Sequence, residues 1–96
     1  MRRYAHKVDG NQARMFKVWR DMCANVEDTS ALGGGFPDAL VTFGGKMYLA
    51  EIKDGYNKLE AVQEMFARRQ EAHGGRVYVI RDERDALAML GARIAA

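Results

Sequence analysis

Three charged side chains, Asp38, Glu51 and Lys53, stand in segments whose other residues are those of buried β-strands. Two carboxylates that lie close together repel each other, so one of them is driven toward its neutral form. A divalent cation removes this repulsion, and two acidic oxygens together with waters and a substrate phosphate suit Mg²⁺. A neighbouring lysine can polarise a water or stabilise charge that develops on a phosphate. If the fold gathers these residues, they can support metal-assisted hydrolysis of a phosphate ester.

A tight hairpin is the element that would gather them. Two apolar runs, 38–43 and 46–53, flank the pair Gly44-Gly45, and a two-residue glycine loop is typical of a β-hairpin. In this register the two carboxylates face each other across the strands and share one side of the sheet. Lys53 follows the second carboxylate by two residues and therefore points to the same side.

The other residues of both hairpin faces are apolar, so we expect both faces to be covered and the charged cluster to lie at the rim of a buried sheet. One face adds Leu40, Met47 and Leu49 to the cluster, and the other carries Ala39, Val41, Tyr48, Ala50 and Ile52. The simpler alternative is an ordinary ion pair between the lysine and one acid at a solvated sheet end. The hairpin register, the glycine-rich entry at 33–35 and the apolar strands favour a site.

Two glutamines lie on apolar helix stripes. Gln63 precedes Phe66 by three residues, and Gln12 precedes Met15 by three, so each amide should face the sheet. A buried amide needs hydrogen-bond partners, and both could support the carboxylates through a metal-bound water or a phosphate. Two alternatives stay open: Gln12 can complete a capping box with Asp9, and Gln63 can reach water at the helix edge.

The elements around the hairpin follow from periodicity and from turn residues. We expect a helix over 10–24, a short strand over 25–28, a helix of about 15 residues between the loop 54–58 and Gly74-Gly75, a strand over 76–81 and a last helix capped by Asp82. The order αβββαβα predicts an α/β fold with a mixed sheet flanked by helices. A crossover helix should make the last two strands parallel.

Length and composition fit one globular domain over 1–96, in which 1–8 form a basic N-terminal arm. The net charge of +2 is compatible with a nucleic-acid partner. A single cysteine, Cys23, excludes an intrachain disulfide and a cysteine-based zinc cluster, and its apolar neighbours predict a core thiol. We find no signal peptide or membrane span in the sequence, and we expect a cytoplasmic protein without a membrane partner.

The motifs Gly35-Phe36-Pro37-Asp38, Glu51-Ile52-Lys53 and Leu59…Gln63, followed by the strand VYVIR, occur in this order along the chain. In this arrangement the chain resembles the PD-(D/E)xK nuclease superfamily. More narrowly, it resembles the stand-alone VRR-NUC domains of phages and bacteria, over residues 9–90. The resemblance implies a restriction-endonuclease-like αβββαβ core, which agrees with the order derived from the periodicity.

The resemblance also implies roles for individual residues. Asp38 and Glu51 would bind Mg²⁺ or Mn²⁺, and the backbone carbonyl of Ile52 would be a further ligand. Lys53 would assist the attacking water, and Gln63 would match the helix glutamine that many of these nucleases keep beside the site.

The first helix departs from the pattern of the family. Many members carry a metal-contacting glutamate there, and this position falls at Gln12, whose neutral amide can hold a metal-bound water but supplies no charge. This departure leaves the number of metal ions and the reaction rate open.

By this resemblance the chain is a Mg²⁺- or Mn²⁺-dependent DNA endonuclease, similar in activity to Holliday-junction resolvases. It would act as a homodimer on branched DNA in a bacterial or phage-infected cell. Basic residues available for phosphate contacts are Arg2, Arg3, His6, Lys7, Arg14, Lys17, Lys58, Arg68 and Arg69. Solvated helix faces explain many of these equally well. Two other hypotheses are a DNA-binding module with a degenerate site, because of Gln12, and a non-nuclease interaction domain that keeps the fold.

Overall fold

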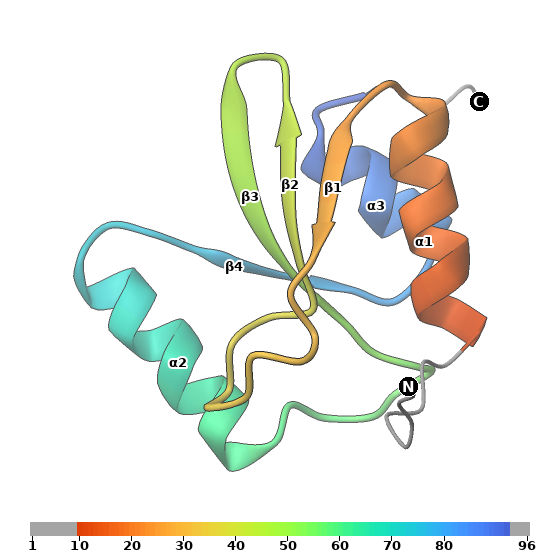
Figure 1. Cartoon of the computed structure of the whole chain (residues 1–96). Helices are drawn as coiled ribbons and strands as arrows, with labels where there is room; N and C mark the ends of the chain where they lie inside the picture. The colour runs from red at the N-terminus through yellow and green to blue at the C-terminus, as the bar shows by residue number, and fades with distance from the viewer. Residues whose placement is uncertain (1–9, 93–96) are drawn as a thin grey trace.

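The structure is a computed structural model that describes residues 10–92 (Figure 1). Its elements are α1 (Gly10–Asp21), β1 (Asn25–Asp28), β2 (Ala39–Phe43), β3 (Lys46–Ile52), α2 (Ala61–Ala72), β4 (Val77–Ile80) and α3 (Glu83–Met89). The predicted order αβββαβα is confirmed. The proposed arm at 1–8 and the proposed cap Asp9 lie outside the described residues.

One mixed sheet carries the strands in the order β1-β2-β3-β4. The strands β1, β2 and β3 pair antiparallel, and β4 pairs parallel to β3. The hairpin has the predicted register, with Phe43 opposite Lys46 and Ala39 opposite Ala50. Gly44 and Gly45 have φ angles of 60° and 80°, and positive φ at both loop residues matches a two-residue hairpin turn to the twist of its strands.

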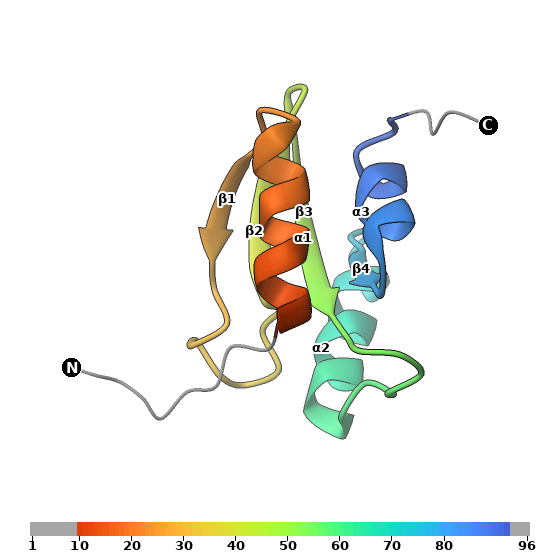
Figure 2. The same cartoon turned by 90° about the vertical axis from the view of Figure 1, so that its right-hand side faces the viewer.

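The helices divide between the two sides of the sheet. Figures 1 and 2 show α1 and α3 together on one side and α2 near one end of the strands on the other. The core lies under α1 and α3, where the buried residues include Met15, Phe16, Trp19, Val26, Ala39, Val41, Ala50, Ile52, Ile80, Ala86 and Met89. The indole Nε1 of Trp19 donates a hydrogen bond of 3.1 Å to the carbonyl of Ala86 and thereby joins the two helices.

The second face of the hairpin is only partly covered, so the expectation of two covered faces was wrong there. Met47 is 66% exposed, and Leu40 and Leu49 on the same face are half-buried. The helix on this side, α2, has 12 residues and buries one of them, Phe66. Since Phe66 packs against Phe36 of the preceding loop, with ring centroids 5.0 Å apart, it does not extend the cover along the strands.

The first helix ends earlier than predicted. Cys23 has a φ of 67°, its N–H bonds to the carbonyl of Arg20, and the N–H of Ala24 bonds to that of Trp19. This pair of bonds is the Schellman motif that terminates helices. Cys23 is consequently exposed, and the prediction of a core thiol was wrong.

Other boundaries move by one or two residues. The hairpin strands cover 39–43 and 46–52, the last strand is 77–80, and α2 begins at Ala61. Val62, in the first turn of α2, is 51% exposed. Across 10–92, none of the helices is both long enough and apolar enough to span a membrane.

Candidate active site

The loop before β2 fixes the first acid. The N–H of Thr29 donates to the carbonyl of Asp38 at 2.9 Å, one step beyond the β1–β2 ladder. The hydroxyl of Thr29 donates to the carbonyl of Pro37 at 2.7 Å, and Pro37 is fully buried. The backbone on both sides of the Pro37–Asp38 peptide is therefore anchored, which sets the direction of the Asp38 side chain.

That side chain meets the second acid. Asp38 Oδ2 accepts a hydrogen bond of 2.8 Å from the N–H of Ile52, and the Asp38 side chain also forms a hydrogen bond with the Glu51 carboxyl. Glu51 is only 3% exposed. The structure thus brings the two carboxyl groups together, as the hairpin predicted.

The Glu51 carboxyl holds its proton unusually tightly. Burial, together with the hydrogen bond and the charge of Asp38, raises its pKa to about 8; the charge of Glu60 adds to this effect and that of Lys53 opposes it. Without a cation the Glu51 carboxyl therefore keeps its proton near neutral pH. A divalent cation in the place of that proton would let both groups ionise.

Lys53 follows directly after β3 and is half-buried. Its N–H donates to the carbonyl of Ile80 at 3.0 Å, which holds the residue against β4. The ion pairs among the described residues are Arg14–Glu83, Lys17–Asp21 and Arg68–Glu64. Since Lys53 belongs to none of them, the alternative of an ordinary ion pair with one of the acids is not what the described part of the chain shows.

Gln63 connects α2 to the acids. Its Nε2 donates to Glu51 Oε2 at 3.1 Å, and its Oε1 accepts from the N–H of Glu60 at 2.8 Å. The amide therefore orients the Glu51 carboxyl and, in the same geometry, caps the first turn of α2. Sequence analysis placed Gln63 toward the sheet, and the structure puts it against the carboxylate cluster.

The glycine-rich entry allows α2 to approach. Gly35 has a φ of 82°, and a Cβ atom at this position would clash with the backbone carbonyl of Val62. Phe36 then stacks edge-on against Phe66. The loop and the start of α2 thus pack backbone against backbone, which places Gln63 within reach of Glu51.

The other predicted glutamine is buried in α1, where Gln12 is 5% exposed. The capping-box alternative for Gln12 cannot be followed, because Asp9 lies outside the described residues. The structure gives Gln12 the burial that the apolar stripe predicted, and a role beside the carboxylates stays a prediction.

Sequence analysis missed Asn11, which is 9% exposed. Its Nδ2 donates to the carbonyls of Lys53 at 3.0 Å and Arg81 at 3.3 Å, and its Oδ1 accepts from Arg14. One amide thus ties the start of α1 to the ends of β3 and β4. The spacing in the sequence could have predicted this burial, because Asn11 precedes the buried Met15 by four residues and so lies on the same face of the helix.

The predicted DNA-contacting residues fall into three groups. Arg2, Arg3, His6 and Lys7 lie outside the described residues. Lys17 forms an ion pair of 2.7 Å with Asp21. Arg14 pairs with Glu83 and Arg68 with Glu64, each at 3.9 Å. The guanidinium of Arg69 lies 5.5 Å from the ring centroid of Phe66. Lys58 is exposed in the loop between β3 and α2 and takes part in none of the ion pairs of the described chain. Lys17 and Arg68 therefore fit the alternative that these cations belong to ordinary solvated helix faces. Lys58 has no such ion pair in the described chain and can contact a phosphate.

The donor atoms of the cluster suit a hard cation. Within the described chain, no group of three or more His, Cys, Asp or Glu residues could hold a metal ion, so the protein donors here are the carboxylates of Asp38 and Glu51 and nearby backbone carbonyls. Mg²⁺ is usually held by one or two carboxylates and keeps several of its waters. The residues present therefore fit Mg²⁺, or Mn²⁺ with the same oxygen ligands.

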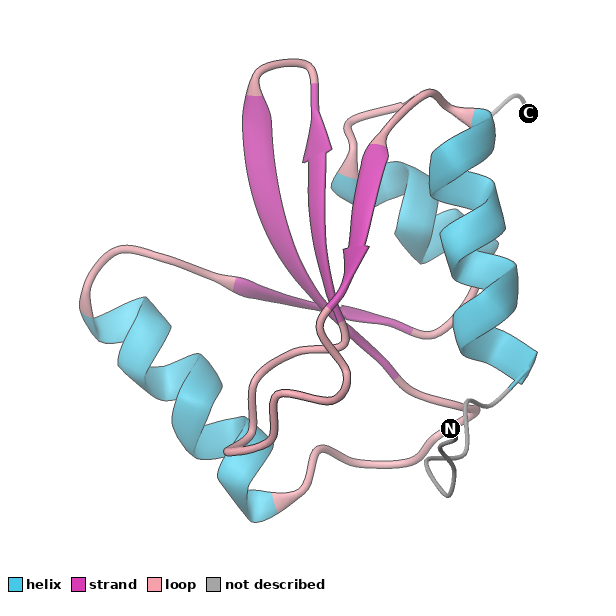
Figure 3. Cartoon of the chain, viewed as in Figure 1, coloured by secondary structure: helices cyan, strands magenta, loops and turns pink. Residues whose placement is uncertain are grey.

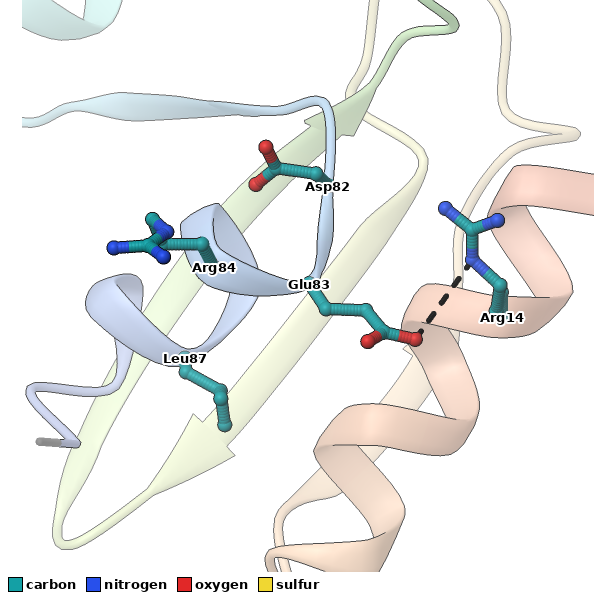
Figure 4. Close-up of a pocket in the computed structure, with 5 residues that line it drawn as sticks. All are labelled: Arg14, Asp82, Glu83, Arg84 and Leu87. Atoms are coloured by element: carbon teal, nitrogen blue, oxygen red, sulfur yellow. Dashed lines mark ion pairs between the residues drawn. The ribbon is translucent and has the colours of Figure 1, made fainter. Parts of the chain in front are cut away.

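A separate hollow lies between α1 and α3, lined by Arg14, Asp82, Glu83, Arg84 and Leu87. Figure 4 shows Arg14 and Glu83 reaching toward each other across it, in the pair of 3.9 Å. None of the carboxylate-cluster residues lines this hollow. The chemistry-bearing residues and this surface depression are therefore distinct features.

No family model matches the chain, and no curated protein matches it. A solved structure described as "VRR_NUC domain" does match, with a TM-score of 0.68 and 22% sequence identity, over 88% of this chain and 98% of that chain. At this identity the likeness establishes the fold. The chain therefore has the fold of a VRR_NUC domain, and the restriction-endonuclease-like architecture expected from the sequence is confirmed.

Proposed function

We propose that the chain is a metal-dependent DNA endonuclease of the PD-(D/E)xK type. The observation that carries the proposal is the buried Glu51 carboxyl, paired with Asp38, oriented by Gln63 and within the electrostatic influence of Lys53. Keeping two carboxyl groups together in a buried position is costly unless a cation joins them. The VRR_NUC fold supports the same assignment.

The residues of the chain divide the work of hydrolysis. Asp38 and Glu51 would hold Mg²⁺ or Mn²⁺, with the carbonyl of Ile52 as a further ligand; the bound cation would lower the pKa of a water and stabilise phosphate charge. Lys53 would orient the attacking water and stabilise the negative charge on the phosphate. Gln63 would keep Glu51 oriented, and Gln12 would hold a water. The water oxygen would bond to phosphorus as the water gives up a proton to solvent, one P–O ester bond would break, and the leaving oxygen would take up a proton from solvent.

The substrate we propose is branched DNA such as a four-way junction. The purified chain should cut four-way and forked DNA in Mg²⁺ and should leave both intact when EDTA replaces the metal. The measurement is a gel assay that compares initial cleavage rates on four-way, forked and linear duplex DNA of the same sequence. Equal rates on all three would refute the structural selectivity, and equal rates with and without EDTA would refute the metal dependence.

We further propose a homodimer, which would present two sites to a symmetric junction. The apolar surface left open supports this proposal, since Leu32, Met47, Val62 and Met65 are each more than half exposed. Multi-angle light scattering should give a mass twice the 10.8 kDa of one chain. A monomer mass across the concentrations at which DNA is cut would contradict it.

A second candidate function is a DNA-binding module whose nuclease site is degenerate. The observation in its favour is Gln12, a buried amide at the position where many related nucleases carry a glutamate. Titration calorimetry with Mn²⁺ separates the two candidates. A nuclease should bind the metal with measurable heat that Asp38→Asn removes, whereas a degenerate module should bind DNA without any metal heat.

A further inference from the structure

The loop that leaves β3 is held in one conformation. The N–H of Asn57 donates to the carbonyl of Asp54 at 3.0 Å, which closes a turn. One atom of Arg81, Nη1, donates to the carbonyl of Gly55 at 2.9 Å and to that of Asn57 at 2.7 Å. The guanidinium therefore fixes the backbone on both sides of the residue between them, Tyr56.

Tyr56 itself touches almost nothing. Its exposed fraction is 98%. The other aromatic rings among the described residues have partners: Phe16 packs with Trp19, Phe36 with Phe66 and Tyr48 with Tyr78, while Phe43 packs against the core. An aromatic ring on a fixed backbone and in open solvent loses little conformational freedom when a partner covers it.

This loop is attached to the candidate site at both ends. Lys53 directly precedes the loop, three residues before Tyr56, and Glu60, two residues after Lys58, donates its N–H to Gln63 Oε1. Lys58, on the same loop, is exposed and belongs to none of the ion pairs of the described chain. Proteins bind unpaired nucleic acid with exposed aromatic rings and cations, since the ring stacks on a base and the cation contacts the backbone phosphate.

We propose that Tyr56 stacks on an unpaired base of the bound DNA and thereby makes the loop 54–58 the element that favours branched or frayed DNA over continuous duplex. In duplex DNA every base already stacks on its neighbours, so the ring gains a partner only where the strands separate. Arg81 is the positioning residue, because its guanidinium fixes the turn that carries Tyr56. This inference rests on the proposed nuclease function and adds to it a residue that determines substrate choice.

The test measures affinity separately from cleavage. Fluorescence anisotropy in EDTA gives dissociation constants for a forked DNA with unpaired arms and for a blunt duplex of equal length. Tyr56→Ala should weaken binding of the forked DNA by about 5- to 160-fold, the range for loss of one base-stacking ring, and should leave duplex binding within about twofold. Tyr56→Phe keeps the ring and should bind both DNAs as the wild type does.

Glu27→Ala is the control, because Glu27 is an exposed residue on β1, the strand at the opposite edge of the sheet from β4. It should leave the affinities for both DNAs unchanged. The inference is overturned if Tyr56→Ala binds forked DNA as tightly as the wild type, or if it loses affinity for both DNAs by the same factor.

The inference and the proposed function can fail separately. DNA that is bound with this dependence on Tyr56, yet stays intact when Mg²⁺ is supplied, would refute only the nuclease. Mg²⁺-dependent cleavage by Tyr56→Ala with an unchanged preference for forked DNA would refute only the stacking role. A wild-type chain that binds neither DNA would refute both.

Discussion

At the scale of single residues, Glu51 connects stability to the proposed chemistry. Its carboxyl is buried beside Asp38, and the two effects together raise its pKa to about 8. In the unfolded chain the same carboxyl has a pKa near 4.5, the ordinary value for a glutamate. Between these two values the native state holds a proton that the unfolded state has released.

This difference predicts how stability changes with pH when no metal is present. As the pH rises from about 4.5 to about 8, Glu51 should lower the free energy of unfolding, because the unfolded state then binds fewer protons than the native state. Above that window the loss from Glu51 should be complete. Glu51→Gln cannot ionise, so it should lack this decline and be more stable than the wild type at alkaline pH.

Urea unfolding in EDTA at several pH values between about 5 and 9 measures this difference. Glu27→Gln is the control, since Glu27 is an exposed acid on β1 and should leave the pH profile of the wild type unchanged. Parallel profiles for Glu51→Gln and the wild type would show that Glu51 ionises normally in the native state.

The same scale shows what the sequence could predict of the site. Asp38, Glu51 and Lys53 were predictable because the glycine turn sets the hairpin register, and register alone decides which side chains share a face. Asn11 and Arg81 were missed because they bind backbone carbonyls of distant segments. The sequence does not show which backbone carbonyls will accept a hydrogen bond from a distant side chain, so such contacts become visible only in the structure.

At the scale of elements, the packing of the 33–37 loop against α2 decides whether Gln63 reaches Glu51. Gly35 is the contact point, where a Cβ atom would clash with the carbonyl of Val62. Gly34 has a similar positive φ of 64°, yet a Cβ atom there would meet nothing within 4 Å. Alanine substitutions at these two neighbouring glycines therefore distinguish the cost of backbone strain from the cost of losing the contact between the loop and α2.

Gly34→Ala should cost about 1–2 kcal/mol of unfolding free energy, the strain of a left-handed residue that carries a Cβ atom. Gly35→Ala should cost clearly more, because the helix must move away from the loop, and it should also slow cleavage by displacing Gln63. Urea denaturation gives the first quantity and the Mg²⁺-dependent cleavage rate the second. Equal losses for the two variants would mean that the close approach at Gly35 does not position α2.

The elements themselves were largely predictable, and the misses have local causes. Strong periodicity and glycine stops fixed the order of helices and strands. The end of α1 was misplaced because Cys23 takes the left-handed conformation that usually falls to glycine. We overestimated how far the second face of the sheet is covered. Apolar composition does not reveal that Phe66, the one buried residue of α2, packs against Phe36 in the 33–37 loop and not against the strands.

At the scale of the whole molecule, the candidate site is assembled from segments that are distant in sequence. The loop before β2 supplies Asp38, the end of β3 supplies Glu51, the residue after β3 is Lys53, and the first turn of α2 supplies Gln63. The sheet with its helices on both sides is a frame that brings these segments to one end of the strands (Figures 1 and 3). Likeness to a VRR_NUC domain over 88% of the chain shows that this frame is shared.

The most direct test of the nuclease assignment is the Mg²⁺-dependent rate of cleavage of a four-way junction by single-residue variants. Asp38→Asn, Glu51→Gln and Lys53→Met keep the size of each side chain and remove its charge. Each should fold and should cut at least about 100-fold more slowly than the wild type, the usual minimum for loss of a group acting in catalysis. Lys46→Met, at the turn end of β3, should cut at the wild-type rate. Cleavage by all three site variants at the wild-type rate would contradict the account.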